Sequence, residues 1–157
     1  MDINCDMGEI PGLLKNNVYS DLMDHVTSIS LACGGHAGDT EMMRELVIIA
    51  KKKNVKVGAH PSYPDRENFG RLELDMASEE LLSSIWNQVY SLLKIAEEEN
   101  ISVSHIKPHG ALYNQAAKDA QVARVIGDAV DRIDPHLNIM CLSGSLMVRV
   151  VEDMGLK

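Results

Sequence analysis

The sequence predicts a parallel α/β fold in which short strands alternate with helices. Five short β-rich runs, most of them apolar throughout, are separated by longer segments whose apolar residues recur about every 3.6 positions. Polar motifs follow directly on four of these runs. The carboxyl ends of parallel strands meet at one edge of a sheet, where α/β folds build their active sites. We therefore expect one pocket at that edge.

The elements can be assigned in order along the chain. Strands are expected at Asp2–Cys5, Thr27–Cys33, Val55–Ala59, Val103–Lys107 and Leu137–Leu142. Helical apolar stripes are expected over Met43–Ala50, Leu82–Ala96, Val122–Ile133 and Met147–Met154. N-caps are expected at Asp39, Ser78, Asp119 and Ser145, and Gly155 is placed to end the last helix. The long irregular connection from His60 to Ala77 is typical of a lid or binding loop.

Composition limits the classes of function. The 157 residues are 45% apolar and 24% charged, which is typical of one soluble domain, here spanning residues 1–157. The net charge of -8 argues against nucleic acid or an anionic membrane as the main partner, because both are polyanions. The sequence shows no signal peptide and no apolar run long enough to span a membrane, so we expect a cytoplasmic protein.

Carboxylates and an amide follow the first expected strand. Asn4 and Asp6 share one face of that strand, because side chains alternate with a period of two, and Glu9 lies just beyond it. Such a set can bind a cation, act as acid or base, or cap the following segment. Near the second strand, Asp39 can cap a helix whose free N–H groups would also suit an anion.

Three histidines stand at three different strand ends. His36, His60 and His109, with Asp6 at a fourth end, could hold a divalent metal with an open position or act as general acids and bases. A permanently bound structural ion is not expected, because the sequence lacks close-spaced ligand pairs such as HxxxH or CxxC. The remaining histidines are assigned structural roles: His25, His105 and His136.

Basic side chains near the expected pocket leave two interpretations open. Lys107 precedes Pro108 at a strand tip, where it could form an ion pair with an aspartate or offer a fixed positive charge to a carboxylate or phosphoryl oxygen. Arg66 and Arg71 lie in the long loop on either side of Phe69, and a guanidinium group suits the same anions or a surface ion pair.

Five motifs, in unbroken order, together resemble the LamB/YcsF family. They are Asn4-Cys5-Asp6-Met7-Gly8-Glu9, Ala32-Cys33-Gly34-Gly35-His36-Ala37-Gly38-Asp39, Gly58-Ala59-His60-Pro61-Ser62-Tyr63-Pro64-Asp65, Phe69-Gly70-Arg71 and Lys107-Pro108-His109-Gly110-Ala111-Leu112-Tyr113-Asn114. The chain departs from the family's usual pattern at Ile10-Pro11-Gly12, Ser30 and Gly35. The last two strands of the family, with a final His-Gly-Asp motif, have no counterpart in these residues.

The resemblance implies a fold and an activity. The implied fold is a parallel (β/α) barrel of the glycoside hydrolase/deacetylase type, here incomplete, with about five of its seven βα units. The implied activity is ATP-dependent opening of the 5-oxoproline lactam to L-glutamate, in a complex with 5-oxoprolinase subunits B and C. A divalent cation could arrive with ATP. The implied site residues are Asn4, Asp6, Glu9, His36, Asp39, His60, Tyr63, Asp65, Arg71, Lys107, His109 and Tyr113.

Within that list we assign catalytic roles to Asp6, His36, His60, Lys107 and His109, and binding of substrate or nucleotide to the others. Two other functions stay open. One is a metal-dependent hydrolase or deacetylase acting on a carbohydrate-like substrate, with Asp6 and the three histidines as ligands. The other is a non-catalytic binding or assembly module.

The incomplete barrel leads to a further expectation. Five strands would leave two sheet edges and an apolar inner face uncovered. We therefore expect a longer polypeptide, or association with a second copy or another chain, and no 5-oxoprolinase activity from these 157 residues alone.

Overall fold

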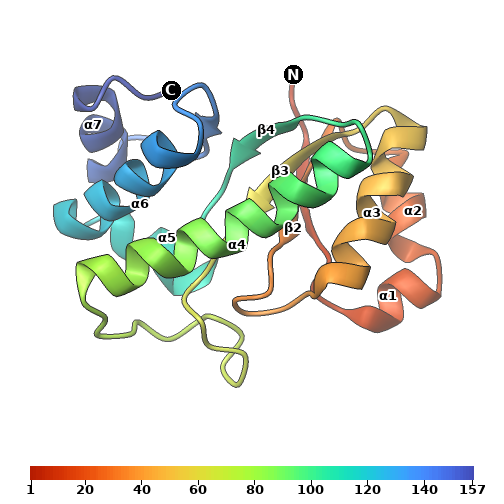
Figure 1. Ribbon diagram of the computed structural model, residues 1–157, viewed down its shortest axis with the longest axis horizontal. Coiled ribbons are helices and arrows are strands. Elements are labelled where there is room, and N and C mark those ends of the chain that lie inside the picture. Colours follow the sequence, from red (N-terminus) through yellow and green to blue (C-terminus); the bar gives the residue numbers. More distant parts are fainter.

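A computed structural model describes residues Met1 to Lys157 and contains one five-stranded sheet (Figure 1). All neighbouring strands are parallel and follow chain order: β1 (Asn4–Met7), β2 (Ser28–Ala32), β3 (Lys56–His60), β4 (Val103–Ile106) and β5 (Asn138–Ile139). This order confirms the predicted α/β class. The last strand is shorter than expected, because only Asn138 and Ile139 pair with β4.

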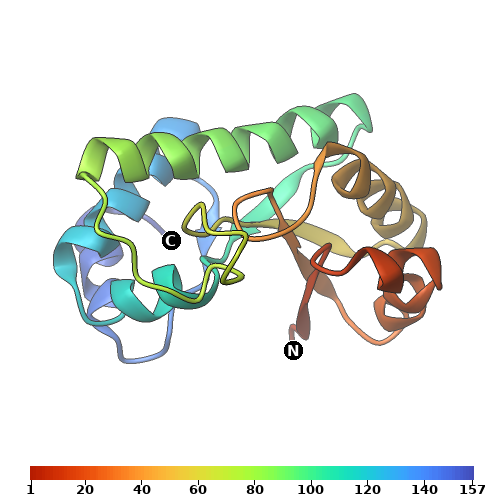
Figure 2. The ribbon, with the colours of Figure 1, turned by 90° about the horizontal axis from the view of Figure 1, so that it is seen from below.

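Seven helices surround the sheet (Figures 1 and 2). They are α1 (Pro11–Lys15), α2 (Val18–Met23), α3 (Thr40–Lys53), α4 (Ser78–Glu98), α5 (Gly110–Ala116), α6 (Ala120–Ile133) and α7 (Leu146–Asp153). The four predicted apolar stripes form α3, α4, α6 and α7, whereas α1, α2 and α5 correspond to no predicted stripe. None of the helices has the length and apolar character needed to cross a membrane.

The helix ends match the sequence signals in part. Asp39 caps α3 by accepting a hydrogen bond from the Met42 amide at 2.8 Å, and Asp119 caps α6 in the same way. The expected cap at Ser78 is wrong by one residue, because Ala77 is the N-cap and Ser78 is the first residue of α4. Ser145 is the N-cap of α7, as predicted, although its side chain makes no capping hydrogen bond. Gly155 follows the end of α7 with a φ of 75°, as predicted.

One face of the sheet packs against the helices. Ile29, Leu31, Val57 and Ile106 are fully buried and belong to a single core of 38 residues that includes the apolar stripes of the helices. Burial of each large aliphatic side chain contributes about 1.5–3 kcal/mol. Helix α4 runs along this layer from the α5–α7 side of the molecule to the α1–α3 side (Figure 1).

The opposite face of the sheet is polar and strongly curved. The Asn4 side chain in β1 reaches the His105 ring in β4 at 3.3 Å, although three strand spacings would separate these strands by about 14 Å in a flat sheet. Asp6 likewise contacts Lys107. This curvature is that of a barrel wall, and it makes the polar face concave. The expected apolar inner face is wrong, because alternation along β1, β2 and β4 turns Asn4, Ser30 and His105 inward.

Candidate functional site

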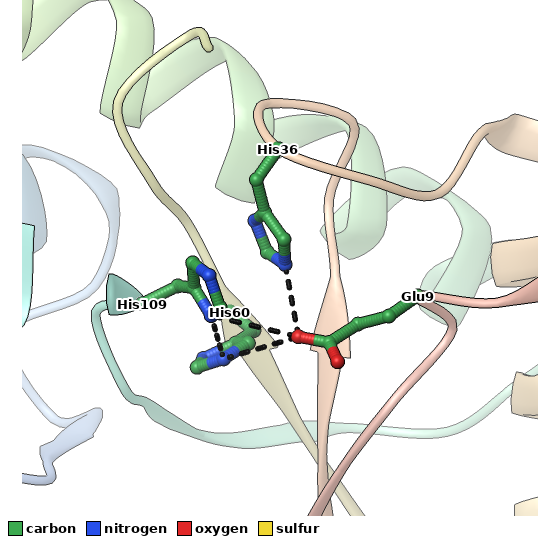
Figure 3. A group of neighbouring side chains, drawn as sticks. All are labelled: Glu9, His36, His60 and His109. Carbon is green, nitrogen blue, oxygen red and sulfur yellow. Dashed lines mark hydrogen bonds and ion pairs between the residues drawn. The ribbon is translucent and has the colours of Figure 1, made fainter. Parts of the chain in front are cut away.

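Four side chains from distant parts of the chain meet at the carboxyl ends of the strands (Figure 3). Glu9 follows β1, His36 lies in the turn between β2 and α3, His60 ends β3, and His109 follows β4. Each offers one potential ligand atom, and these atoms all lie within 4.8 Å of one another. We name these four residues the His–Glu cluster.

The backbone around Glu9 and His36 is held by side-chain hydrogen bonds. The buried Tyr19 hydroxyl of α2 accepts hydrogen bonds from the Glu9 and Ile10 amides at 3.0 and 2.9 Å. Arg66 donates to the carbonyl groups of Gly34 and Gly38, on either side of His36. Arg66 therefore fastens the long loop to the β2–α3 turn, and this contact replaces the anion-binding role considered for it.

The two other histidines are held by a continuation of the β3–β4 ladder. The Lys107 amide donates to the Ala59 carbonyl at 2.9 Å, and the His109 amide donates to the Pro61 carbonyl at 2.8 Å. His60 Nδ1 lies 2.6 Å from the Lys107 carbonyl oxygen. His60 and His109 thus approach each other, with 3.0 Å between Nε2 and Nδ1.

The loop of residues 61–77 covers the cluster. The Phe69 ring meets the His36 and His109 rings edge-on, with centroids 5.2 and 5.4 Å away. Its neighbour Gly70 has a φ of +64°, and a Cβ at this position would lie 2.9 Å from His36 Cβ. Only glycine fits such a close approach at a positive φ. The loop therefore excludes water from one side of the rings.

Burial sets the protonation of the cluster. Burial lowers the pKa of His60 to about 4, against the opposing effect of Asp6, and burial followed by the charge of His36 lowers the pKa of His109. Burial alone would raise the pKa of Glu9, but the hydrogen bond from His36 and the neighbouring rings outweigh it, so the pKa of Glu9 is lowered. An ionised Glu9 beside neutral His60 and His109 rings is the arrangement that these shifts favour at neutral pH.

A cavity of about 520 Å³ adjoins the cluster. It is lined by Asp6, His60, Arg71, Lys107, Pro108, His109, Gly110, Tyr113 and Asn114. Lys107 Nζ contacts both Asp6 oxygens, at 2.7 and 2.9 Å, so the ion pair considered for Lys107 is present. The Lys107 and Asp6 side chains stay 27% and 34% exposed, which leaves both accessible from the cavity.

A second polar group lies one layer deeper on the concave face, and we name Asn4, Ser28, Ser30 and His105 the lower polar layer. The Asn4 amide group donates to Ser28 at 2.9 Å and lies 3.3 Å from His105 Nε2, while the Ser30 hydroxyl donates to Asn4 Oδ1 at 2.9 Å. His105 Nδ1 lies 2.9 Å from Ser104 Oγ. His105 is thus a hydrogen-bonded core residue, in line with the structural role assigned to it.

Several residues expected at the site lie elsewhere. Asp39 is an exposed helix cap, Tyr63 donates to Gln115 at 2.6 Å beside a different cavity, and Asp65 accepts two hydrogen bonds from Asn68 within its own loop. Asn4 belongs to the lower polar layer. The structure thus brings together eight of the twelve candidates, in the cluster and in the cavity: Asp6, Glu9, His36, His60, Arg71, Lys107, His109 and Tyr113.

Sequence reasoning missed two contributors. Phe69 covers the His36 and His109 rings, and Asn114 lines the cavity one residue after Tyr113. The position of Phe69 between two arginines in a long loop was the available signal, but nothing in the sequence gives the direction of the ring.

Comparison with known proteins gives a consistent result. The family model described as LamB/YcsF family matches residues 1–157. Two proteins named as the A subunit of 5-oxoprolinase, from Haemophilus influenzae (strain PittEE) and Pyrococcus abyssi (strain GE5 / Orsay), are 44% and 41% identical over 157 residues. The crystal structure of lactam utilization protein from Thermus thermophilus superimposes with a TM-score of 0.94 at 36% identity.

The chain covers only part of these relatives. The matches include 100% of this chain but 62% of the length of each of the two relatives and 64% of the Thermus thermophilus chain. The activity of the longer proteins is therefore a proposal for this chain.

Proposed function

This chain belongs to the LamB/YcsF family, and on that premise we propose that it acts as one component of an ATP-dependent 5-oxoprolinase. The reaction would open the 5-oxoproline lactam to L-glutamate. The relatives carry the name of the A subunit, which supports subunits B and C as partners, and one solved relative is named a lactam utilization protein. ATP and a cytoplasmic location are parts of the same proposal.

The observation that carries the proposal is the pairing of cationic side chains with imidazoles in one cavity. Arg71 and Lys107 line the same space as His60 and His109. The substrate 5-oxoproline carries a carboxylate next to its lactam ring, and guanidinium and ammonium groups bind carboxylates and phosphoryl oxygens well. The cavity thus offers an anion anchor beside groups that can move a proton.

The chemistry of a lactam explains the need for both features. An amide carbonyl is a weak electrophile, and phosphorylation of its oxygen by ATP would make the ring carbon open to attack by water. We assign Arg71 and Lys107 to the substrate carboxylate or the phosphoryl group, and proton transfer to His60 or His109. Asp6 would hold Lys107 in place and could act as a base, because its Oδ2 lies 3.4 Å from His60 Nε2.

The test is an assay of the protein with its partner subunits. We expect glutamate and ADP to be released together, and Arg71→Met and Lys107→Met to lower kcat/KM for 5-oxoproline by about 10- to 100-fold, since each removes a charged hydrogen bond. Arg44→Met is the control, because Arg44 pairs with Glu98 and Glu99 on the helix surface. Glutamate release that is unchanged in both cavity variants would contradict the proposal.

A second candidate function is favoured by the His–Glu cluster itself. Three imidazoles and a carboxylate within 4.8 Å are also the groups that a metal-dependent hydrolase or deacetylase would use. Omitting ATP distinguishes the two functions. Hydrolysis of an amide or ester that continues without ATP would favour the second candidate, and strict dependence on ATP would favour the first.

A further inference from the structure

We propose that the His–Glu cluster is a binding site for one divalent transition-metal cation, with Glu9, His36, His60 and His109 as ligands (Figure 3). Three imidazole nitrogens and one carboxylate oxygen suit Zn²⁺ or Co²⁺, whereas Mg²⁺ and Ca²⁺ prefer oxygen ligands throughout. The site is therefore distinct from any Mg²⁺ that accompanies ATP, and the inference does not depend on the lactam reaction.

The first argument concerns the tautomers of two histidines. His60 Nδ1 lies 2.6 Å from the Lys107 carbonyl oxygen, and His109 Nε2 lies 2.9 Å from the Phe69 carbonyl oxygen. A carbonyl oxygen only accepts hydrogen bonds, so both of these ring nitrogens carry the proton. The other two nitrogens, His60 Nε2 and His109 Nδ1, then carry lone pairs in the neutral rings.

These two lone-pair nitrogens face each other. They are 3.0 Å apart, and they lie 3.9 and 3.5 Å from Glu9 Oε1, which also only accepts. Three acceptors pointed at one another are repulsive unless a cation lies among them. Histidine ligands of metals almost always donate their other N–H to a carbonyl or carboxylate, as both of these rings do.

The third histidine is placed by ring packing and by one contact with Glu9. His36 Nε2 lies 3.1 Å from Glu9 Oε1, and its Nδ1 is buried without a partner. The ring stacks on His109 at 3.6 Å between centroids, with 4° between the planes. Stacking and the edge of Phe69 therefore aim Nε2 at the same point as the other ligand atoms.

Four of the six separations among the cluster atoms are close to those of a four-coordinate site. Zinc–nitrogen and zinc–oxygen bonds of about 2.0–2.1 Å place tetrahedral ligand atoms about 3.3 Å apart. The four separations are 3.0, 3.1, 3.5 and 3.9 Å, and the other two are no longer than 4.8 Å. Asp6 Oδ2, 3.4 Å from His60 Nε2, borders the cluster on the side of the cavity. A substrate in the cavity would therefore approach the cation beside Asp6.

The sequence alone does not lead to this ligand set. It predicts no permanently bound ion, for lack of close-spaced ligands, and it offers Asp6 as a ligand where the structure has Glu9. The ligands come from four separate strand ends, which no local spacing reveals.

The test measures metal binding in the absence of ATP and lactam. The purified protein is stripped with chelator and titrated with Zn²⁺ and Co²⁺, and bound metal is counted by elemental analysis after gel filtration. We expect one equivalent of either ion, the intense visible absorption of tetrahedral Co²⁺, and no displacement by excess Mg²⁺. Glu9→Gln and His60→Gln should each weaken binding by at least about 100-fold, in line with the loss of a metal ligand.

The control variants are His136→Gln, an exposed histidine, and His105→Gln in the lower polar layer, both of which should bind like the wild type. The Co²⁺ spectrum of the unmodified protein needs no variant, so a folding defect in a variant does not affect it. Absence of Zn²⁺ and Co²⁺ binding by the unmodified protein, or equal binding by the Glu9 and His60 variants, would overturn the proposal. Lactam opening by chelator-stripped enzyme would leave the proposed function intact, because the two measurements are independent.

Discussion

The His–Glu cluster and the lower polar layer lie on the same concave face of one sheet, and both are built around buried histidines. In the lower polar layer every group finds a complementary partner. Ser104 donates to the Val57 carbonyl and lies 2.9 Å from His105 Nδ1, and Asn4 lies 3.3 Å from His105 Nε2. Nδ1–H can therefore donate to Ser104 while Nε2 accepts from Asn4, and the neutral ring is satisfied without any ion.

In the His–Glu cluster, by contrast, not every polar group has a complementary hydrogen-bond partner. His60 and His109 turn their unprotonated nitrogens toward each other and toward Glu9, and His36 Nδ1 has no partner. Buried polar groups left unsatisfied in a folded protein need a reason, and a functional site is a common one. The comparison shows that hydrogen-bond completeness, rather than burial, separates a structural histidine from a candidate ligand.

The largest expected effect comes from changing one histidine in each layer. His60→Gln should lower kcat/KM of the assembled enzyme by at least about 100-fold, because His60 both lines the cavity and belongs to the His–Glu cluster. His105→Gln should lower kcat/KM by less than about tenfold, since it touches neither the cavity nor the cluster. Its free energy of unfolding should fall by about 1–3 kcal/mol, because the contacts of His105 with Asn4 and Ser104 are lost.

The measurement pairs steady-state kinetics with denaturant unfolding of the same two proteins. If His105→Gln were as inactive as His60→Gln while keeping its stability, the division between the two layers would be wrong. If His60→Gln retained full activity, the cluster would have no part in catalysis.

The sequence predicted the alternation of parallel strands with helices and the edge at which the site forms, because apolar runs and the motifs that follow them are local signals. It missed α1, α2 and α5, which are short helices of five to seven residues. Helices of that length have little period of their own and are stabilised by tertiary packing.

The site itself was predicted less fully than the fold. Glu9 rather than Asp6 joins the histidines, because Lys107 pairs with Asp6 and the Tyr19 hydroxyl holds the Glu9 backbone. Each of these contacts joins residues that are separated along the chain, so no local pattern in the sequence predicts them. Tyr63 and Asp65 point away because the path of residues 61–77 is set by contacts to other elements. The association expected from the incomplete barrel stays a prediction.

The next effect concerns pH. Burial lowers the pKa of His105 to about 4, below the value near 6.5 of an unfolded histidine. Between these values the unfolded chain binds the extra proton, so stability is full above pH 6.5 and falls as the pH drops toward 4. The loss attributable to His105 is about 3 kcal/mol.

Burial also lowers the pKa of His60 to about 4, so it contributes a loss of the same sign. Denaturant unfolding between pH 7 and 4, with chelator present, should therefore show a shallower decline for His105→Gln than for the wild type. Identical declines would mean that His105 takes up a proton as readily in the folded protein as in the unfolded chain, which would contradict its lowered pKa.

The smallest expected effect tests how tightly the lower polar layer is packed. Gly58 in β3 lies against the His105 ring, and a Cβ at this position would lie 2.1 Å from His105 Nε2. Gly58→Ala should therefore force the ring to move and lower the free energy of unfolding by about 1–3 kcal/mol, the usual cost of overpacking. In a His105→Ala background the added methyl group has room, so the same change should cost little, and the two substitutions should be non-additive by at least about 1 kcal/mol.

The stoichiometry of Zn²⁺ binding should stay the same in Gly58→Ala, because the Gly58 Cβ position faces His105 and not the ligands of the cluster. Additive costs would show that the ring and Gly58 are not in close contact, and loss of Zn²⁺ from Gly58→Ala would show that the two layers form a single network.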